Sequence, residues 1–561
     1  MRQLRRSCNN NYSSSHGVFQ VGGHKPRFTN RLWSNAETYV ILENMSSDPA
    51  TTPRKTSPTL RRLLSWSRFL AWLSLTVVGK MLTALIFLVV GGIVALLIIG
   101  IVALDRRDDL SIWHTVVLEE EFTEDSGDTT FADYLAREER LFAELAERIY
   151  AGSEPVNASV IQRYRKGSPA DPTGYVTNWN RTFELPPETG TPTCGVLLLH
   201  GMSDSPYSLR SLGETLRADG AHVVGLRLPG HGTVPSGLLE FTHEDMQAAV
   251  ELAMAHLRDT VGDRPLYLVG YSNGGALSVH YALEALENES LPKASGVVLV
   301  SPAIGVTGMA AFAVWQGRVG HWLGLEKLAW NSISAEYDPY KYNSFPVNAG
   351  DQVYRLTVEI GRHLDRLAGS GNLDKVPPVL AFQSAVDATV STPALIEGLF
   401  SKLPGDRHEL VLFDLNRTGQ IESFLRSDPK KHLTRLILSS DKPFSLTVVA
   451  NRNEDSTALE VRHYARRDTQ AQISDPGLTW PDGIYSLAHV ALPFSPTDPL
   501  YGAGLGLDPK KSGLQIGNLH LRGEKGVLQI SPVDQLRLRW NPFYSYLEER
   551  VAGFVFGRQV P

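Results

Sequence analysis

The sequence predicts an α/β fold in which a mostly parallel sheet carries helices on both faces. From about residue 176, short apolar runs alternate with helix-like segments. Strands buried on both faces have this continuous apolar character. The chain has 561 residues, 42% of them hydrophobic and 20% charged, which is enough to bury a sizeable core. One apolar run ends in Gly-Tyr-Ser-Asn-Gly-Gly and leads directly into a helix-like segment. We therefore expect one large α/β domain, at residues 176–561, preceded by segments of a different kind.

The N-terminal segment, residues 1–69, is rich in Asn, Ser, Thr, Pro and Arg, and we expect it to be a disordered basic tail. Met45 is a second possible start. Residues 1–80 contain 12 Lys and Arg against 3 Asp and Glu, a net charge of +9. Because the whole chain has a net charge of −6, the remainder has −15. An acidic main domain argues against nucleic-acid binding.

Residues 70–104 are predicted to anchor the chain in a membrane. Met81–Leu104 contains 24 residues without a charge, and a bilayer core needs about 20. Basic residues precede this run, whereas acids balance the two arginines of the Asp-Arg-Arg-Asp-Asp that follows. The positive-inside rule then places the N-terminus in the cytoplasm and the main domain on the extracytoplasmic side of a single-pass protein. A signal peptide is less favoured, since the run is long and lacks a small-residue cleavage site.

Residues 105–175 are predicted to form a juxtamembrane stalk and helix. Within them, Phe131–Tyr150 repeats apolar residues at helical spacing, with acids and arginines between. The pattern allows an amphipathic stalk helix or a first helix packed on the main domain.

Five apolar runs are expected to be the buried strands of the main domain. They are Gly195–Gly201, Ala221–Gly232, Pro265–Gly270, Gly296–Pro302 and Pro377–Ser384. Helix-like segments between them predict parallel pairing.

Two insertions interrupt this alternation. Residues 415–480 contain alternating strand-like runs and are expected to be a β-rich insertion. Residues 303–375 are expected to form a mostly helical cap insertion. The cap is marked by its aromatic residues, Trp315, Trp322, Trp330, Tyr337, Tyr340, Tyr342 and Phe345.

Ser272 is the candidate nucleophile. Gly270 ends the strand-like run before it, and Gly274 with Gly275 opens the helix-like segment after it. A serine on a tight turn between a strand and a helix is held up for attack, and glycines beside it avoid collisions.

The loop at His200–Leu209, His-Gly-Met-Ser-Asp-Ser-Pro-Tyr-Ser-Leu, is the candidate oxyanion loop. A serine hydrolase needs two backbone N–H groups where negative charge develops on the carbonyl oxygen. We expect the amides of Met202 and Asn273 to provide them. His200 itself is expected to shape the loop.

These motifs resemble one branch of a known superfamily. His-Gly-Met-Ser-Asp-Ser-Pro-Tyr-Ser-Leu, Leu-Arg-Leu-Pro-Gly-His-Gly, Gly-Tyr-Ser-Asn-Gly-Gly and the Val-Asp of Ser-Ala-Val-Asp-Ala-Thr-Val are similar to the monoacylglycerol lipase and serine aminopeptidase-type branch of the α/β-hydrolases. The resemblance covers residues 190–415 and returns near residue 489. It implies the α/β-hydrolase fold, a Ser-His-Asp triad and a structural role for His231.

The acid and the base must follow Ser272 in the order acid, then histidine. Asp387 follows a predicted strand and is the first candidate acid, with Asp414 as the alternative. Relatives place the histidine after the next strand, but that loop here, Asp414–Gln420, has none. His489, 102 positions after Asp387, is the first candidate base, displaced by the β-rich insertion. The alternatives are His408, His432 and His463.

The sequence thus predicts a membrane-anchored serine hydrolase that cleaves carboxylic esters, with a lipid ester as substrate and the bilayer as partner. Such a hydrolase is expected to need no metal or cofactor. Cys8 and Cys194 are not expected to form a disulfide. One alternative is an aminopeptidase of the same fold, with Glu336 or Asp338 receiving the substrate's ammonium group. The other is a non-catalytic membrane-tethered binding protein. The oligomeric state stays open.

Overall fold

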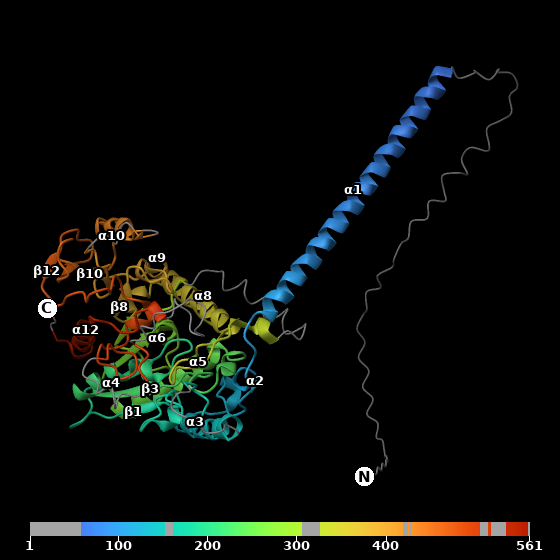
Figure 1. The fold of residues 1–561 in the computed structure, drawn as a ribbon. Helices are drawn as coiled ribbons and strands as arrows, with labels where there is room; N and C mark the ends of the chain where they lie inside the picture. The colour runs from blue at the N-terminus through green and yellow to red at the C-terminus, as the bar shows by residue number, and fades with distance from the viewer. Residues whose placement is uncertain are drawn as a thin grey trace, which may run out of the picture. The chain divides into compact units, whose positions relative to one another are not determined.

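The computed structural model describes residues 58–151, 161–305, 326–418, 424–425, 428–504, 514–517 and 535–558. Two units can be distinguished, Met1–Ala95 and Leu96–Pro561. The second contains every strand of the described residues (Figure 1). Most of the predicted N-terminal tail, residues 1–57, lies outside the described residues.

Helix α1, Pro58–Asp105, contains the predicted membrane segment. Its span Ser65–Gly92 is long and apolar enough to cross a membrane, judged by length and composition. This span begins before the predicted one at Met81–Leu104, because the apolar character of the helix extends upstream past Lys80. Within α1, side chains such as Phe87 and Leu88 are each 72% exposed.

The main sheet has ten strands in the order β1-β3-β2-β4-β5-β8-β9-β10-β11-β12. The strands from β3 to β10 in this order are parallel, and β1, β11 and β12 at the edges pair antiparallel. The five predicted strands correspond to β2, β3, β4, β5 and β8. The strands are β1 Phe183–Leu185, β2 Cys194–Leu199, β3 Ala221–Leu226, β4 Leu266–Tyr271, β5 Gly296–Val300, β8 Val379–Ser384, β9 Glu409–Phe413, β10 Ser445–Asn451, β11 Leu459–Tyr464 and β12 Gln472–Ser474.

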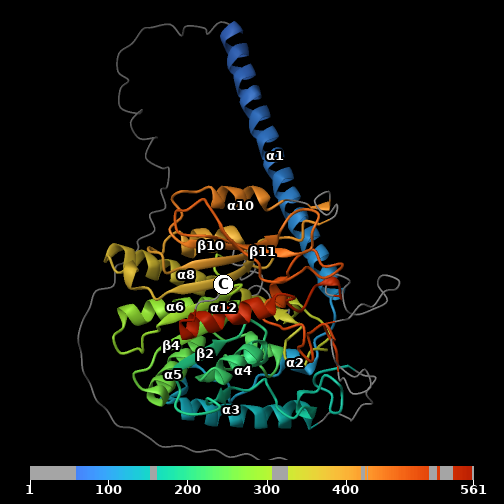
Figure 2. The same cartoon turned by 90° about the vertical axis from the view of Figure 1, so that its left-hand side faces the viewer.

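Helices cover both faces of this sheet, as predicted. Alternate residues of β2 enter different cores: Leu197 and Leu199 join one, Val196 and Leu198 the other. Helices α3, α5, α6 and α8 contribute to the first core, and α4 and α12 to the second (Figures 1 and 2). The described α-helices after α1 are α2 Ile112–Thr115, α3 Phe131–Leu145, α4 Arg210–Ala218, α5 His243–Val261, α6 Asn273–Glu287, α8 Val347–Gly369, α9 Thr392–Leu395, α10 Lys430–Ile437 and α12 Tyr544–Phe556.

Helix α3 packs on the main domain, which is the second of the two alternatives left open for it. Phe131 stacks on His256 of α5 with ring centroids 4.7 Å apart. Tyr134 and Glu138 are buried, and the Tyr134 hydroxyl donates to the carbonyl of Arg227. The domain therefore begins before residue 176, and α3 is not a stalk.

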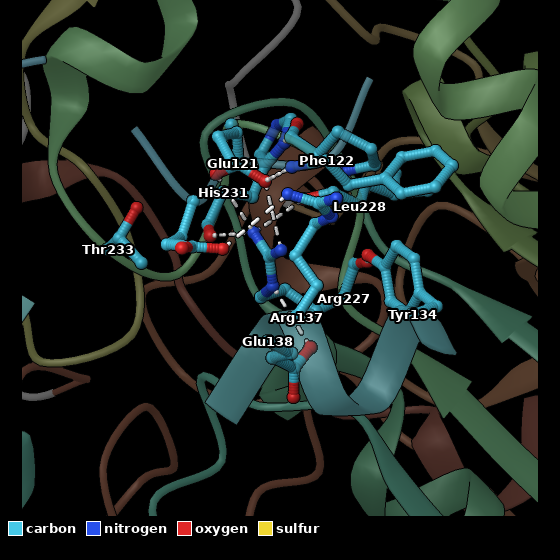
Figure 3. Close-up of polar contacts among 12 residues, drawn as sticks. Glu121, Phe122, Tyr134, Arg137, Glu138, Arg227, Leu228, His231 and Thr233 are labelled. Atoms are coloured by element: carbon cyan, nitrogen blue, oxygen red, sulfur yellow. Dashed lines mark hydrogen bonds and ion pairs between the residues drawn. The ribbon is translucent and has the colours of Figure 1, made fainter. Parts of the chain in front are cut away.

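Arg227, just after β3, ties this N-terminal segment to the sheet (Figure 3). Its guanidinium donates to Glu138 at 3.0 Å and to Glu121 at 2.9 Å, and also to the carbonyl of His231 at 3.0 Å. Arg227 is 1% exposed. The acids before and within α3 thus neutralise a charge buried beneath the loop that follows β3.

The predicted cap insertion, residues 303–375, has two parts in the described structure. Residues 326–346 are mostly irregular, with a short pair of strands, β6 Trp330–Ser332 and β7 Phe345–Pro346. Helix α8 instead buries Leu356, Ile360 and Leu364 in the core beneath the sheet, so it is a crossover helix between β5 and β8. Its amphipathic pattern did not distinguish a cap from a sheet-covering helix. Trp315 and Trp322 lie outside the described residues.

The predicted β-rich insertion, residues 415–480, extends the main sheet. Strand β10 pairs parallel with β9, and β11 and β12 continue the sheet antiparallel. Helix α10 lies between β9 and β10 in the sequence, as expected for a parallel crossover.

Candidate active site

Ser272 occupies the turn between β4 and α6 in a strained backbone conformation. Its φ is 52° and its ψ is −116°, a region that residues with a Cβ rarely adopt. Its carbonyl accepts the amide of Ala303, and its amide donates to Val300, so the turn is fixed to the end of β5. Strain of this kind persists only where surrounding contacts over-determine it.

The glycines around Ser272 are required by close backbone contacts. A Cβ at Gly274 would lie 2.0 Å from the carbonyl oxygen of Leu199 at the end of β2. A Cβ at Gly270 would lie 2.2 Å from the carbonyl oxygen of Gly274. The helix therefore starts directly against two strand ends, which only glycine allows at these positions.

Ser272, His489 and Asp387 form a hydrogen-bonded series. The Ser272 Oγ lies 3.1 Å from Nε2 of His489, and Nδ1 of His489 lies 2.8 Å from Oδ2 of Asp387. The side chains of His489 and Asp387 are 4% and 0% exposed. The two ring nitrogens of His489 thus face a hydroxyl on one side and a carboxylate on the other.

The surroundings of Asp387 keep it ionised. Burial raises its pKa, but the hydrogen bond and charge of His489 and the amides of Val390 and Thr389 outweigh burial, so the pKa lies below its ordinary value. Gln383 of β8 also donates to Oδ2 of Asp387 at 3.0 Å. Gln383 was not predicted from the sequence, although an amide side chain inside a buried strand is a signal that could have indicated it.

His489 reaches Asp387 because the chain returns to the end of β9 after the sheet extension. The backbone amide of Asn416 donates to the carbonyl of Tyr485 at 2.8 Å. The side-chain amide of Asn416 donates to the carbonyl of Ile484 at 3.0 Å. Asn416 lies in the loop after β9, where the resemblance described above predicts the histidine. The extension therefore adds residues between β9 and His489. The loop that contains His489 nevertheless stays beside the carboxyl end of β9.

The alternative acid and bases have other surroundings. Asp414 accepts two hydrogen bonds from Arg417, at 2.7 and 3.0 Å. His408 precedes β9, and His463 pairs with Thr447 near the start of β10, so both lie at the amino edge of the parallel strands, opposite Ser272. His432 is exposed on α10.

The two predicted oxyanion amides belong to positions with fixed backbones. Asn273 is the first residue of α6. Met202 follows β2, beside Ser203, whose φ is 63°. Within the part of the chain that the structure describes, neither the Met202 nor the Asn273 backbone amide donates a hydrogen bond.

Two buried histidines hold the loops around Met202. Nδ1 of His200 donates to the carbonyl of Gly201 at 2.9 Å, and its Nε2 accepts the amide of Leu228 at 3.0 Å. Nδ1 of His231 donates to the carbonyl of Pro229 at 2.8 Å. Burial lowers the pKa of His231 to about 4 and that of His200 well below its ordinary value. Neutral imidazoles with these partners fit the loop-shaping roles predicted for them.

Three aromatic residues of segment 326–346, Trp330, Tyr340 and Tyr342, are buried, and Tyr337 and Phe345 are half-buried. Tyr340 stacks on Tyr207 with centroids 4.2 Å apart, and Trp330 is 1% exposed. The Tyr342 hydroxyl accepts the amide of Thr233 at 2.7 Å. These rings hold the segment together.

Glu336 and Asp338, the acids considered for an ammonium group, are also buried, at 0% and 1% exposure. Glu336 accepts the amides of Asn343 and Ser344 at 2.9 and 2.8 Å, and Asp338 accepts the Tyr501 hydroxyl at 2.6 Å. Both carboxyls are used in ordering their own loop.

Glu336 should make stability depend on pH. Burial raises its pKa to about 7 from an ordinary value of 4.5, although two amides donate to it. Between these values the folded chain keeps a proton that the unfolded chain has released. The contribution of Glu336 to the free energy of unfolding therefore falls as pH rises through this window and is constant above it. Relative to Glu336→Gln, the wild type should lose about 3 kcal/mol between pH 4.5 and 7.5.

Chemical denaturation of both proteins across this pH range measures the effect. Glu454→Gln, at a side chain that is 72% exposed, is the control and should follow the wild type. Parallel pH curves for wild type and Glu336→Gln would contradict the prediction.

The sheet order, the helices on both faces and the serine at a strand–helix turn define an α/β-hydrolase fold. Residues 190–415 match the family model described as "Serine aminopeptidase, S33". The thermostable monoacylglycerol lipase of Bacillus sp. (strain H-257) is 27% identical over 217 residues, covering 39% of this chain and 79% of that protein. Phospholipase YtpA of Bacillus subtilis (strain 168) is 28% identical over 120 residues, 20% of this chain and 42% of that protein.

Solved structures are also similar. The crystal structure of Paleococcus ferrophilus monoacylglycerol lipase has 20% identity and a TM-score of 0.31, and the match covers 42% of this chain and 88% of that one. The metagenome-derived lipolytic enzymes LipS and LipT give a match at 23% identity with a TM-score of 0.33, covering 42% of this chain and 89% of that one.

Proposed function

We propose that this chain is a serine hydrolase that cleaves carboxylic esters of lipids through an acyl-enzyme. The observation that carries the proposal is the hydrogen-bonded series of Ser272, His489 and Asp387 at a strained turn. The similarity to proteins named monoacylglycerol lipase and phospholipase supports ester hydrolysis.

In the proposed reaction, Ser272 Oγ attacks the ester carbonyl carbon while Nε2 of His489 takes its proton. The tetrahedral intermediate collapses, the ester C–O bond breaks, and His489 gives the proton to the leaving alcohol. A water molecule then loses a proton to His489 and attacks the acyl carbonyl, which releases the carboxylic acid and restores Ser272. Asp387 orients the imidazole and stabilises its charged form.

The amides of Met202 and Asn273 are proposed to hold the oxyanion. Both lack an acceptor within the described residues; Asn273 begins helix α6, and Met202 lies beside Ser203, whose φ is 63°. One such donor contributes about 3 kcal/mol of transition-state stabilisation in other enzymes.

A small apolar cluster supports an apolar acyl group. Ala303, Val353 and Val390 form a small buried cluster with Met202 packed against it. The Ala303 amide donates a hydrogen bond to the carbonyl of Ser272, and the Val390 amide donates one to the carboxylate of Asp387. This apolar cluster therefore adjoins the proposed triad. Burying apolar chain there would contribute about 25 cal/mol per Å².

The candidate membrane span in α1 supports a second part of the proposal, a tethered enzyme. Anchoring would keep the domain near lipid substrates. The basic residues before the span favour a cytoplasmic N-terminus, with the hydrolase domain on the extracytoplasmic side.

Labelling by a fluorophosphonate tests the nucleophile in the full chain. The wild type should be labelled at Ser272, located by peptide mass spectrometry, and Ser272→Ala should not be labelled. A folded wild type that resists the probe would favour the non-catalytic binding protein.

Turnover of 4-nitrophenyl butyrate, a long-chain monoacylglycerol and an aminoacyl anilide tests the substrate class. We expect hydrolysis of both esters and little of the anilide, since Glu336 and Asp338 are buried in their loop. Turnover of the anilide alone would favour the aminopeptidase and overturn the ester proposal.

A further inference from the structure

Three side chains from three elements converge at the β1 edge of the sheet. Oε1 of Glu184, on β1, lies 2.6 Å from Nε2 of His222 on β3 and 2.9 Å from Nε2 of His256 on α5. All three atoms lie within 4.8 Å of one another. Among the described residues, this is the group of His, Cys, Asp and Glu side chains that converges closely enough to hold a metal ion.

The backbone places each of these side chains on the same face. Strand β1 pairs antiparallel with β3 so that Glu184 lies opposite Val224. His222 is two residues from Val224, so its side chain points to the same face as that of Glu184 and is its diagonal neighbour. Helix α5 covers this face, and Phe131 of α3 stacks on the His256 ring at 4.7 Å. Rigid elements therefore aim two imidazoles at one carboxylate.

The donor set is one that zinc uses. Two imidazole nitrogens and a carboxylate oxygen bind Zn²⁺ at about 2.0–2.2 Å, and water completes a tetrahedron. The side chains of Glu184, His222 and His256 are 35%, 9% and 30% exposed, so an ion can enter and keep a water ligand.

We propose that Glu184, His222 and His256 form a zinc site that fastens the edge strand β1 to helix α5. The lone pairs of both Nε2 atoms and the Glu184 carboxylate would bind the ion, with each imidazole proton on Nδ1. No covalent bond within the chain changes.

The position of the site assigns it a structural role. His222 is the second residue of β3, so it lies near the amino ends of the parallel strands. Ser272 follows the last residue of β4, at the carboxyl ends. The ion would therefore be far from the proposed hydrolytic site and would stabilise the segment that includes α3, through the contact between Phe131 and His256.

Zinc binding by the full chain tests this proposal. The protein is purified in detergent with a tag that contains no histidine, stripped with EDTA and dialysed. Isothermal titration with ZnCl₂ and elemental analysis after desalting should both give one zinc per chain. Glu184→Gln, which keeps the size and the acceptor oxygen, should weaken binding at least about 10-fold, and so should His256→Ala.

The matched control is His432→Ala, because His432 is exposed on α10 and should leave zinc binding unchanged. Ser272→Ala should also bind zinc normally, which separates this proposal from the proposed hydrolysis. At zinc concentrations about 100-fold above Kd, the Tm of the wild type should rise by about 3 °C, and that of Glu184→Gln should not.

The melting curves in EDTA show whether each variant is folded. Absence of zinc binding by the wild type would overturn the proposal. Equal binding by wild type and Glu184→Gln would also overturn it, since the ion would then be held elsewhere.

Discussion

Replacing His489 with alanine is expected to lower kcat/KM for ester hydrolysis by about four to six orders of magnitude. The imidazole lies 3.1 Å from the Ser272 hydroxyl and is the only described histidine hydrogen-bonded to it. Without a base, the serine keeps its proton and attacks slowly. Initial rates with 4-nitrophenyl butyrate, measured on protein with an unchanged circular dichroism spectrum, give the effect.

The other histidines and acids provide controls for this prediction. His432→Ala and His463→Ala should stay within about twofold of the wild type, since surface changes away from a site have small effects. Asp387→Asn should lower kcat by about 10⁴, because the amide fixes the wrong imidazole tautomer. Asp414→Asn should leave the chemical step intact, because Asp414 accepts hydrogen bonds from Arg417 and not from His489. Near-normal activity of His489→Ala would refute the proposed base.

Replacing Arg227 with methionine is expected to lower the free energy of unfolding by about 3–5 kcal/mol. Removing one partner of a buried ion pair leaves the other charge uncompensated. Here the charges left behind are those of Glu138, which is 4% exposed, and of Glu121. Burial already raises the pKa of Glu138, and the charge of Arg227 opposes that rise. Denaturation followed by tryptophan fluorescence measures the loss.

Arg181→Met is the matched control, because Arg181 bonds to Glu139 with exposures of 31% and 73%. Exposed pairs of this kind contribute at most about 1 kcal/mol. The triple change Arg227→Met, Glu138→Leu and Glu121→Gln should recover part of the lost stability, since no buried charge is then left alone. A loss below 1 kcal/mol for Arg227→Met alone would contradict this account.

The local patterns of the sequence predicted much of the sheet. Runs such as Pro265–Gly270 are apolar throughout because both faces are covered, and the glycines beside Ser272 follow from contacts within a few residues and one neighbouring strand. The order of triad residues along an α/β-hydrolase chain then pointed to Asp387 and His489 as candidates. The structure brings both side chains together with Ser272. Their catalytic roles stay predictions.

Features that depend on distant pairing were not predicted. No local pattern indicates that Arg227 lies between Glu121 and Glu138. Arg227 is 89 positions from Glu138 and 106 positions from Glu121 in the sequence. The same holds for Glu184, His222 and His256, which no short metal-binding motif connects. The prediction that β10 belongs to an insertion failed to show its pairing with β9, because β9 precedes β10 by more than 30 residues. The prediction of a cap at helix α8 was wrong, because an amphipathic pattern does not show which part of the protein covers the apolar face.

The sheet extension between β9 and His489 has a consequence for the timing of synthesis. On the proposed roles, the nucleophile and its acid are complete once residue 387 has been translated, but the base follows 102 residues later. A nascent or prematurely terminated polypeptide that ends within the extension carries Ser272 without the group that activates it. Such a product would be inert towards esters, so hydrolytic activity would begin only after residue 489 has been synthesised.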